Sequence, residues 1–280
     1  MGFGSHPPAV WLGFSALVLA LLILDLGSLN RRSHVLSMKE ATAWSAGLVS
    51  LALAFGGFIY WMEGTQAALE YYAGYLIELS LSVDNLFVFI LIFQYFSVPA
   101  RLQPRILKWG ILGAIIMRAI MIAAGALLLA RFHWIIWVFG AILIITGIKM
   151  FQAGEERIEP EKNPIVRLAR RFLPFTAAYG RRETFFIRTR GGWVATPLLL
   201  VLLVVEWSDL VFAIDSIPAI FAVTRDPFIV YASNVFAILG LRALFFVLAG
   251  AMDKFVYLKP SVYLILVFVG LKMSLSQWIK

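Results

Sequence analysis

The sequence predicts an all-α, polytopic membrane protein with about eight transmembrane helices, and three observations support this fold class. Of the 280 residues, 61% are hydrophobic and 14% are charged, whereas soluble domains contain about 45–50% apolar and about 25% charged residues. The mean hydropathy is +0.88. The apolar residues also gather in runs close to the roughly 20 residues that a helix needs to cross a bilayer.

Eight such runs can be placed along the chain. They cover residues 9–29, 42–62, 72–97, 107–130, 134–151, 195–223, 229–251 and 260–279. The first run lacks a basic start and is followed by Arg31 and Arg32, so we interpret it as a membrane span rather than a signal peptide. The 280 residues contain no cysteine, which excludes disulfides and thiolate metal sites among them.

Basic residues lie mostly on one side of these spans. Counted between alternate runs, 17 of the 24 Lys and Arg residues fall on one side and three on the other. Because basic loops stay inside, this bias predicts both termini outside and a cytoplasmic loop at 152–193. The expected location is the inner (plasma) membrane of the cell. The net charge of +8 therefore marks membrane sidedness, and no nucleic-acid partner is expected.

Three motifs recur in the same order in the third to fifth runs and in the sixth to eighth. The pairs are Glu78-x5-Asp84-Asn85 with Asp209-x5-Asp215-Ser216, Gly110-x7-Arg118 with Asn234-x7-Arg242, and Gly147-Ile148-Lys149 with Gly270-Leu271-Lys272. A duplicated unit of three helices must enter the membrane from opposite sides, which predicts an inverted 3+3 repeat. Residues 1–70 then form an N-terminal two-helix hairpin, 71–151 the first repeat, 152–194 a basic loop and 195–280 the second repeat.

The loop between the repeats contains two further patterns. The segment NPIVRLARRFLPF is basic and amphipathic, which predicts a helix on the anionic inner leaflet, with partner docking as the alternative. The segment FFIRTRGGWVATP predicts a short hairpin.

Ten ionisable residues lie inside the apolar runs, where each costs several kcal/mol unless it is paired or hydrated. They are the acids Asp25, Glu78, Asp84, Glu206, Asp209 and Asp215 and the bases Arg118, Arg242, Lys149 and Lys272. Helical spacing places Glu78, Ser82 and Asn85 on one stripe, and Glu206, Asp209 and Ser216 on the matching one. Pro218 predicts a local break that turns Asp215 toward this group.

Carboxylate, amide and hydroxyl oxygens are the ligands of hard divalent cations such as Mn²⁺, Mg²⁺ or Ca²⁺. The sequence therefore predicts a metal site near the membrane midplane. Its expected ligands are Glu78, Asp84, Asn85, Glu206, Asp209, Asp215 and Ser216. Arg118 and Arg242 are expected to balance the charge, with Ser82, Asp25, Lys149 and Lys272 as accessory residues. Two alternatives stay open: a proton path through the carboxylates, and acids that only pair with the bases to hold helices together.

The stretches ELSLSVDNLFVFILIF, WGILGAIIMRAIMIAAGALLL, VEWSDLVFAIDSIPAIFAVTRDP and VGLKM resemble the TerC family of integral membrane proteins. The family is named for tellurium resistance, and the resemblance implies metal-ion homeostasis with Mn²⁺ export. It also implies a repeat architecture similar to the lysine-exporter-like transporters. These implications attach to the SVDN block around Asp84 and Asn85, and to the AIDSIP block around Asp215 and Ser216.

Together these features predict a secondary transporter, not an enzyme, that exports a divalent cation, manganese(II) foremost, with proton antiport as an added hypothesis. Manganese is expected as cargo, without a tightly bound cofactor, and the lipid bilayer as the surroundings. No nucleotide partner is expected because the chain lacks a GxxxxGK[ST] motif. The alternatives are a non-transporting scaffold of a tellurium or stress-resistance complex, and an intramembrane protease using Asp84 and Asp215. A homo-oligomer stays open.

Overall fold

The computed structural model describes residues 6–25, 37–132, 134–152, 164–176, 179, 184–189 and 192–250, with the backbone alone at 84, 147 and 149–152. The larger helices are α1 (Pro8–Ile23), α2 (Met38–Glu63), α3 (Thr65–Tyr95), α4 (Gln103–Arg131), α5 (Ile135–Gln152) and α7 (Pro197–Phe221). The shorter elements are the 3₁₀ helix η2 (Ala100–Leu102), α6 (Pro164–Phe172), β1 (Phe186–Thr189), β2 (Gly192–Ala195), α8 (Pro227–Leu239) and α9 (Leu241–Ala249). These helices correspond to the first seven predicted spans, and the eighth, 260–279, lies outside the described residues.

Length and apolar character separate two kinds of helix in this bundle. Within the described ranges, α2, α3, α4 together with η2, and α7 are long and apolar enough to cross a membrane. Helices α8 and α9 together form a fifth candidate, bent by 42° at their junction. Helices α1 and α5 are shorter and apolar. The protein is therefore a polytopic helical membrane protein, while the count of eight spans stays a prediction.

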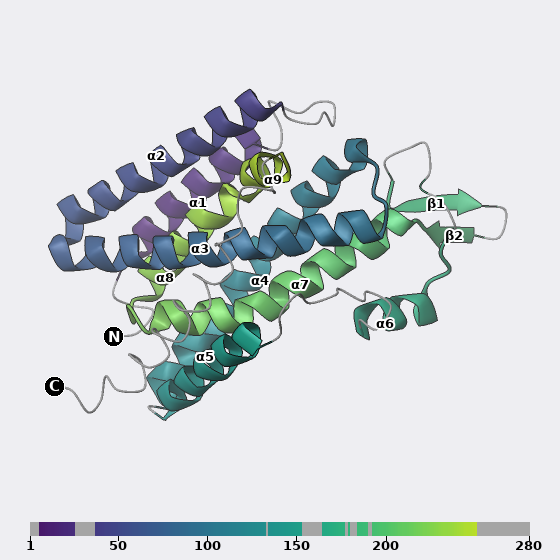
Figure 1. Ribbon diagram of the computed structural model, residues 1–280. Coiled ribbons are helices and arrows are strands. Elements are labelled where there is room, and N and C mark those ends of the chain that lie inside the picture. The colour runs from purple at the N-terminus through teal and green to yellow at the C-terminus, as the bar shows by residue number, and fades with distance from the viewer. Residues whose placement is uncertain are drawn as a thin grey trace.

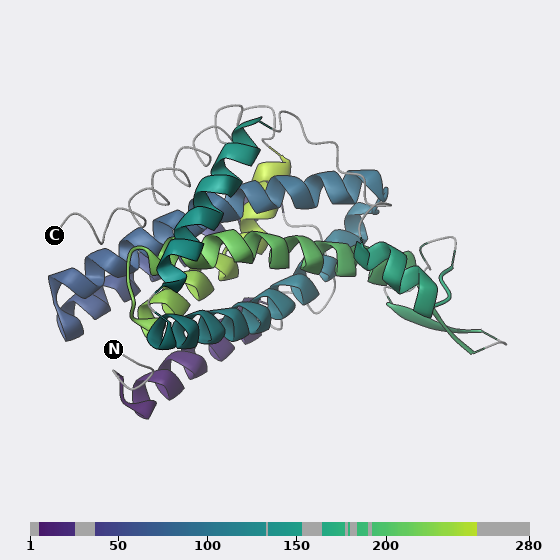
Figure 2. The ribbon, with the colours of Figure 1, turned by 90° about the horizontal axis from the view of Figure 1, so that it is seen from below.

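Helix α3 lies in the middle of the bundle and packs against α2, α7, α8 and α9, while α4 packs against α7 and α8. Figure 2 shows α7 running between α3 and α4. The last residue of α3, Tyr95, and the first of α7, Pro197, line one groove, so the two helices run antiparallel. An inverted repeat requires this antiparallel relation between the first helices of its two units. The last helix of the second unit, predicted at 260–279, falls outside the described part of the chain.

Local signals explain how α2 and α3 meet. Ser37 and Glu40 form a reciprocal capping box that starts α2. Gly64 ends α2 with a φ of 88°, a conformation that glycine adopts without steric cost, and α3 begins at the next residue. The resulting turn lies at the opposite end of the molecule from β1 and β2 (Figure 1). We call the two ends the turn end and the hairpin end.

The predicted features of the inter-repeat loop are present at the hairpin end (Figure 1). The basic stretch forms the amphipathic helix α6, and β1 pairs antiparallel with β2 with Phe186 opposite Ala195. The all-α fold class thus holds for the bundle, with this small sheet added. The Tyr179 hydroxyl donates to the Phe96 carbonyl at 2.9 Å, and burial raises the pKa of Tyr179 to about 12.

Candidate functional site

Three long helices each place one charged residue close to their middle. These residues are Glu78 on α3, Arg118 on α4 and Asp209 on α7. All three are buried, with exposed fractions of 0%, 0% and 3%. Helices that are long enough to span a bilayer therefore bring two acids and one base together near its midplane.

Arg118 is the centre of this group. Its Nη1 donates to the Glu78 carboxylate, to Asn234 Oδ1 at 2.7 Å and to Ser216 Oγ at 3.2 Å. Its Nη2 donates to Asp209 Oδ1 at 3.2 Å. The hydroxyl of Ser82 lies 3.4 Å from Glu78 Oε1. We define the Arg118 cluster as these six buried residues: Glu78, Ser82, Arg118, Asp209, Ser216 and Asn234.

The Arg118 cluster has unused hydrogen-bonding capacity. Glu78 Oε2, Asp209 Oδ2 and Arg118 Nε are buried and lack a hydrogen-bond partner among the described residues. The buried amide nitrogen of the nearby Asn85 has none there either. Two carboxylates share one guanidinium, so the cluster carries a formal charge of −1 when both acids are ionised. The cluster can therefore accept one further positive charge.

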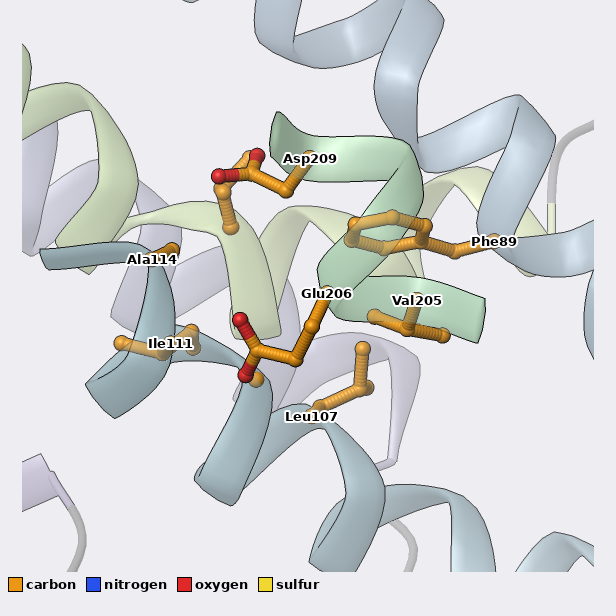
Figure 3. A pocket seen from close by; sticks show the side chains of 9 residues that line it. Phe89, Leu107, Ile111, Ala114, Val205, Glu206 and Asp209 are labelled. Carbon is orange, nitrogen blue, oxygen red and sulfur yellow. The ribbon is translucent and has the colours of Figure 1, made fainter. Parts of the chain in front are cut away.

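A small pocket connects the cluster with a third carboxylate (Figure 3). It lies toward the hairpin end, because Glu206 precedes Asp209 on α7, which begins at Pro197 directly after β2. Its volume is about 10 Å³, close to the minimum for one water molecule. Glu206 and Asp209 contribute its two carboxylates, which lie on the same side of α7 and face α4. Glu206 is half-buried and lies against Gly113, where even an added Cβ would collide with its carboxylate.

Asp215 is placed differently from the sequence-based prediction. Its carboxylate accepts a hydrogen bond from Thr146 on α5 at 2.9 Å, whereas the next residue, Ser216, contacts Arg118. Successive side chains on a helix point about 100° apart, so only one of the two can face the cluster. The predicted break at Pro218 is absent, because α7 continues through it to Phe221. The side chain of Asp84 lies outside the described part.

Arg242 likewise contacts Asp25, and not the acids of the Arg118 cluster, among the described side chains. Its Nη2 contacts Asp25 Oδ1 at 2.6 Å, and Trp44 Nε1 donates to the same oxygen at 2.8 Å. This buried pair joins α9 to the end of α1, with Trp44 adding α2. Asp25 therefore has the pairing role that the sequence allowed. The side chain of Lys149 and the whole of Lys272 lie outside the described residues.

The sequence reading missed two polar residues as site candidates. Asn234 binds Arg118, although the repeat comparison had marked it only as a partner of Gly110. Thr146 binds Asp215. Both stand in apolar runs, where a buried polar side chain needs a partner, and this was the signal that could have identified them.

The long apolar helices and their buried ionic cluster define the class: a polytopic integral membrane protein with a polar centre between its helices. The chain belongs to the TerC family, because the model described as "Integral membrane protein TerC family" matches residues 63–280. No solved structure matches the chain significantly.

Named relatives cover nearly the whole sequence. An "Uncharacterized membrane protein STKORF319" of Myxococcus xanthus is 55% identical over 98% of this chain and 85% of its own length. The "Putative membrane-bound redox modulator Alx" of Escherichia coli K12 is 50% identical over 97% of this chain and 87% of its own length. An "Uncharacterized membrane protein" of Rickettsia bellii is 41% identical over 96% and 89%, respectively.

Proposed function

We propose that this protein is a secondary transporter that exports a divalent cation, manganese(II) foremost, in exchange for protons. The observation that supports this function most directly is the Arg118 cluster. Glu78 and Asp209 share one arginine in the middle of three long helices, and each has a buried oxygen without a partner among the described residues.

Charge balance links this geometry to exchange. An uncompensated charge inside a membrane protein costs several kcal/mol, so a cluster with two carboxylates and one guanidinium favours one added positive charge. A proton on one carboxylate supplies it in one state. A divalent cation brings two positive charges, so in the other state it balances the two carboxylates only when Arg118 moves away from both acids. Protons and cations then exclude each other, which is the requirement for antiport.

The donor set favours a hard cation. The Arg118 cluster offers carboxylate oxygens from Glu78 and Asp209, the amide oxygen of Asn234, and the hydroxyls of Ser82 and Ser216. Mn²⁺, Mg²⁺ and Ca²⁺ prefer such oxygen ligands. Asp84 and Asn85 remain expected ligands from the sequence.

Glu206 fits a role in access to the cluster. It is half-buried and shares the small pocket with Asp209, one helical turn further along α7. The pocket lies on the side of Asp209 that faces the hairpin end, for which the charge pattern predicts the cytoplasm. Glu206 would therefore receive a cation from the cytoplasmic side and pass it to Asp209.

The Alx relatives are named as redox modulators, so the proposed function should also be compatible with a redox effect. This chain has no cysteine, so its own side chains cannot carry out thiol–disulfide exchange. Manganese is itself redox-active, so exporting it would let a TerC protein change the redox state of a cell without a thiol of its own.

The test is Mn²⁺ flux into proteoliposomes containing the full chain, with and without an imposed pH gradient. Glu78→Gln and Asp209→Asn should each slow Mn²⁺ flux on the order of tenfold or more. Mutation of a residue that only hydrogen-bonds a metal ligand already lowers metal affinity or activity by that factor. Glu70→Gln is the matched control, because Glu70 is only half-buried near the start of α3 and belongs to neither the Arg118 cluster nor the pocket beside it. Asp84→Asn and Asp215→Asn test the two acids of the sequence motifs.

Three results would contradict the proposal. Wild-type flux in both Glu78→Gln and Asp209→Asn would exclude the Arg118 cluster as the site. Flux that ignores the pH gradient would exclude proton exchange. If deletion of 155–185 abolished the resistance of cells to tellurium or stress while Asp209→Asn did not, a non-transporting scaffold would explain the function better.

A further inference from the structure

A second group of metal-ligating side chains lies at the turn end of the molecule, whereas Glu206 lies on the side of Asp209 toward the hairpin end. It consists of His6 before α1, Glu63 at the last position of α2, and Asp226 before α8. We propose that His6, Glu63 and Asp226 form a binding site for a divalent transition-metal cation at the outer surface. This inference goes beyond the proposed function and does not depend on it.

The three side chains already converge on one point. His6 Nε2 lies 2.9 Å from Asp226 Oδ2, and His6 Nδ1 lies 3.6 Å from Glu63 Oε1. One potential ligand atom from each residue falls within 4.8 Å of the other two. Residues that are distant in the sequence thus meet where three helix ends come together, and modest side-chain rotation would let all three face one ion.

Two of these side chains are held in place by other contacts. Asp226 caps α8 by accepting from the Phe228 amide through Oδ1 at 2.8 Å, which leaves Oδ2 directed at His6. The Asp226 amide donates to Thr224 Oγ1 at 3.2 Å. The His6 ring packs on Phe228 with 4.8 Å between the ring centres. Such fixed orientation reduces the entropic cost of binding an ion.

The group is also open to water. The side chains of His6, Asp226 and Glu63 have exposed fractions of 10%, 17% and 24%. An ion can therefore reach the group from solution and keep water molecules as further ligands. The more exposed Glu63 side chain has the freedom to move toward the ion.

The chemistry of the three ligands selects a class of ion. A neutral imidazole and two carboxylates carry a charge of −2, which one divalent cation balances. A mixed nitrogen and oxygen set suits Zn²⁺ and other transition metals that bind imidazole, whereas Mg²⁺ and Ca²⁺ prefer oxygen alone. The site therefore differs in ligand type from the all-oxygen acids of the Arg118 cluster.

An ion at this position would tie α8 to α1 and α2. Asn234, which binds Arg118, lies two helical turns beyond Asp226 on α8. Binding at the surface would thus fix the start of the same helix that reaches the Arg118 cluster.

The experiment is titration of the purified full chain with Zn²⁺ by isothermal calorimetry, after chelator treatment and without a polyhistidine tag. We expect one saturable site, and an affinity lower on the order of tenfold to 100-fold in His6→Ala, Glu63→Gln and Asp226→Asn. Asp226→Asn keeps an oxygen to cap α8, so its loss of binding would report the missing charge. The Glu70→Gln variant, which changes an acid outside this group, is the control and should bind as the unmutated chain does.

A second measurement separates ligand loss from misfolding. Zn²⁺ should raise the thermal unfolding temperature of the unmutated chain and of Glu70→Gln, but not that of the three site variants. The double variant Glu78→Gln/Asp209→Asn should still bind Zn²⁺, so this site can fail or succeed independently of transport. No saturable binding by the unmutated chain would overturn the proposal, as would unchanged Zn²⁺ affinity in His6→Ala and Asp226→Asn.

Discussion

Replacing Arg118 by methionine is expected to destabilise the protein strongly. Arg118 has no exposed surface and donates hydrogen bonds to four residues of three other helices. Methionine fills part of the volume but supplies no donor. The change would leave Glu78 and Asp209 as buried acids without their counter-charge.

The expected size follows from this arrangement. Removing one partner of a buried ion pair costs about 3–5 kcal/mol, because the remaining charge is left uncompensated. Neutralising Glu78 as well should return part of that cost, since the double variant Arg118→Met/Glu78→Gln has one fewer stranded acid. Residues in direct contact show coupling energies of roughly 0.5–3 kcal/mol, so the rescue should be measurable.

The assay is unfolding of the purified protein in detergent, followed by tryptophan fluorescence. Arg131→Met is the matched control, because Arg131 is exposed in the last turn of the same helix. Its effect should stay within about 0.5 kcal/mol. The reasoning is refuted if Arg118→Met also stays within that range, or if adding Glu78→Gln destabilises the variant further.

Two further predictions concern positions outside the Arg118 cluster. Gly113→Ala should displace the Glu206 carboxylate, a mobile side-chain end, and so slow Mn²⁺ flux while thermal stability stays nearly unchanged; Gly110→Ala, whose Cβ would meet Val205 at an ordinary 3.5 Å, should leave flux intact. Equal flux in the two glycine variants would refute the role of Glu206. Tyr179→Phe should cost about 1 kcal/mol at neutral pH, through loss of the hydrogen bond to Phe96. Because the pKa of Tyr179 is raised from 10 to about 12 in the folded chain, stability of the unmutated protein should fall as pH rises from 10 to 12. The phenylalanine variant should show a smaller fall over that range, and an equal fall would contradict the assignment.

Much of the fold could be predicted from the sequence because membrane helices are defined by local composition. The apolar runs located every long helix, and the basic amphipathic stretch located α6. The residues at which helices begin were predicted less accurately than the presence of the helices. Helix α3 begins at Thr65 rather than at 72, because Gly64 alone makes the turn from α2 and the polar Thr65 and Gln66 still belong to the helix.

The candidate site was predictable in part. Helical spacing correctly grouped Glu78 with Ser82 and Asp209 with Ser216, because residues on one stripe share a helix face. Pairing between helices was not predictable in this way. Arg242 aligns with Arg118 in the repeat, yet the bend between α8 and α9 precedes it, and among the described residues it pairs with Asp25, just after α1.

The packing around the Arg118 cluster shows which side of it is closed. Toward the hairpin end, Asp209 borders the pocket that contains Glu206. Toward the turn end, the cluster is followed by an apolar group that α4, α7 and α8 form together. Its buried members are Ile122, Ala213, Ile217, Ile220, Phe221 and Val230.

This apolar group sets the movement that the proposed transport requires. Gly125 on α4 leaves so little space that an added Cβ would lie 2.9 Å from the Phe221 ring. In the proposed transport, an ion that leaves Asp209 between α4 and α7 toward the turn end would have to pass this contact. Among the described residues, α4 and α7 are thus packed together on the side where His6, Glu63 and Asp226 lie, and the proposed transport would require the end of α7 to move away from α4.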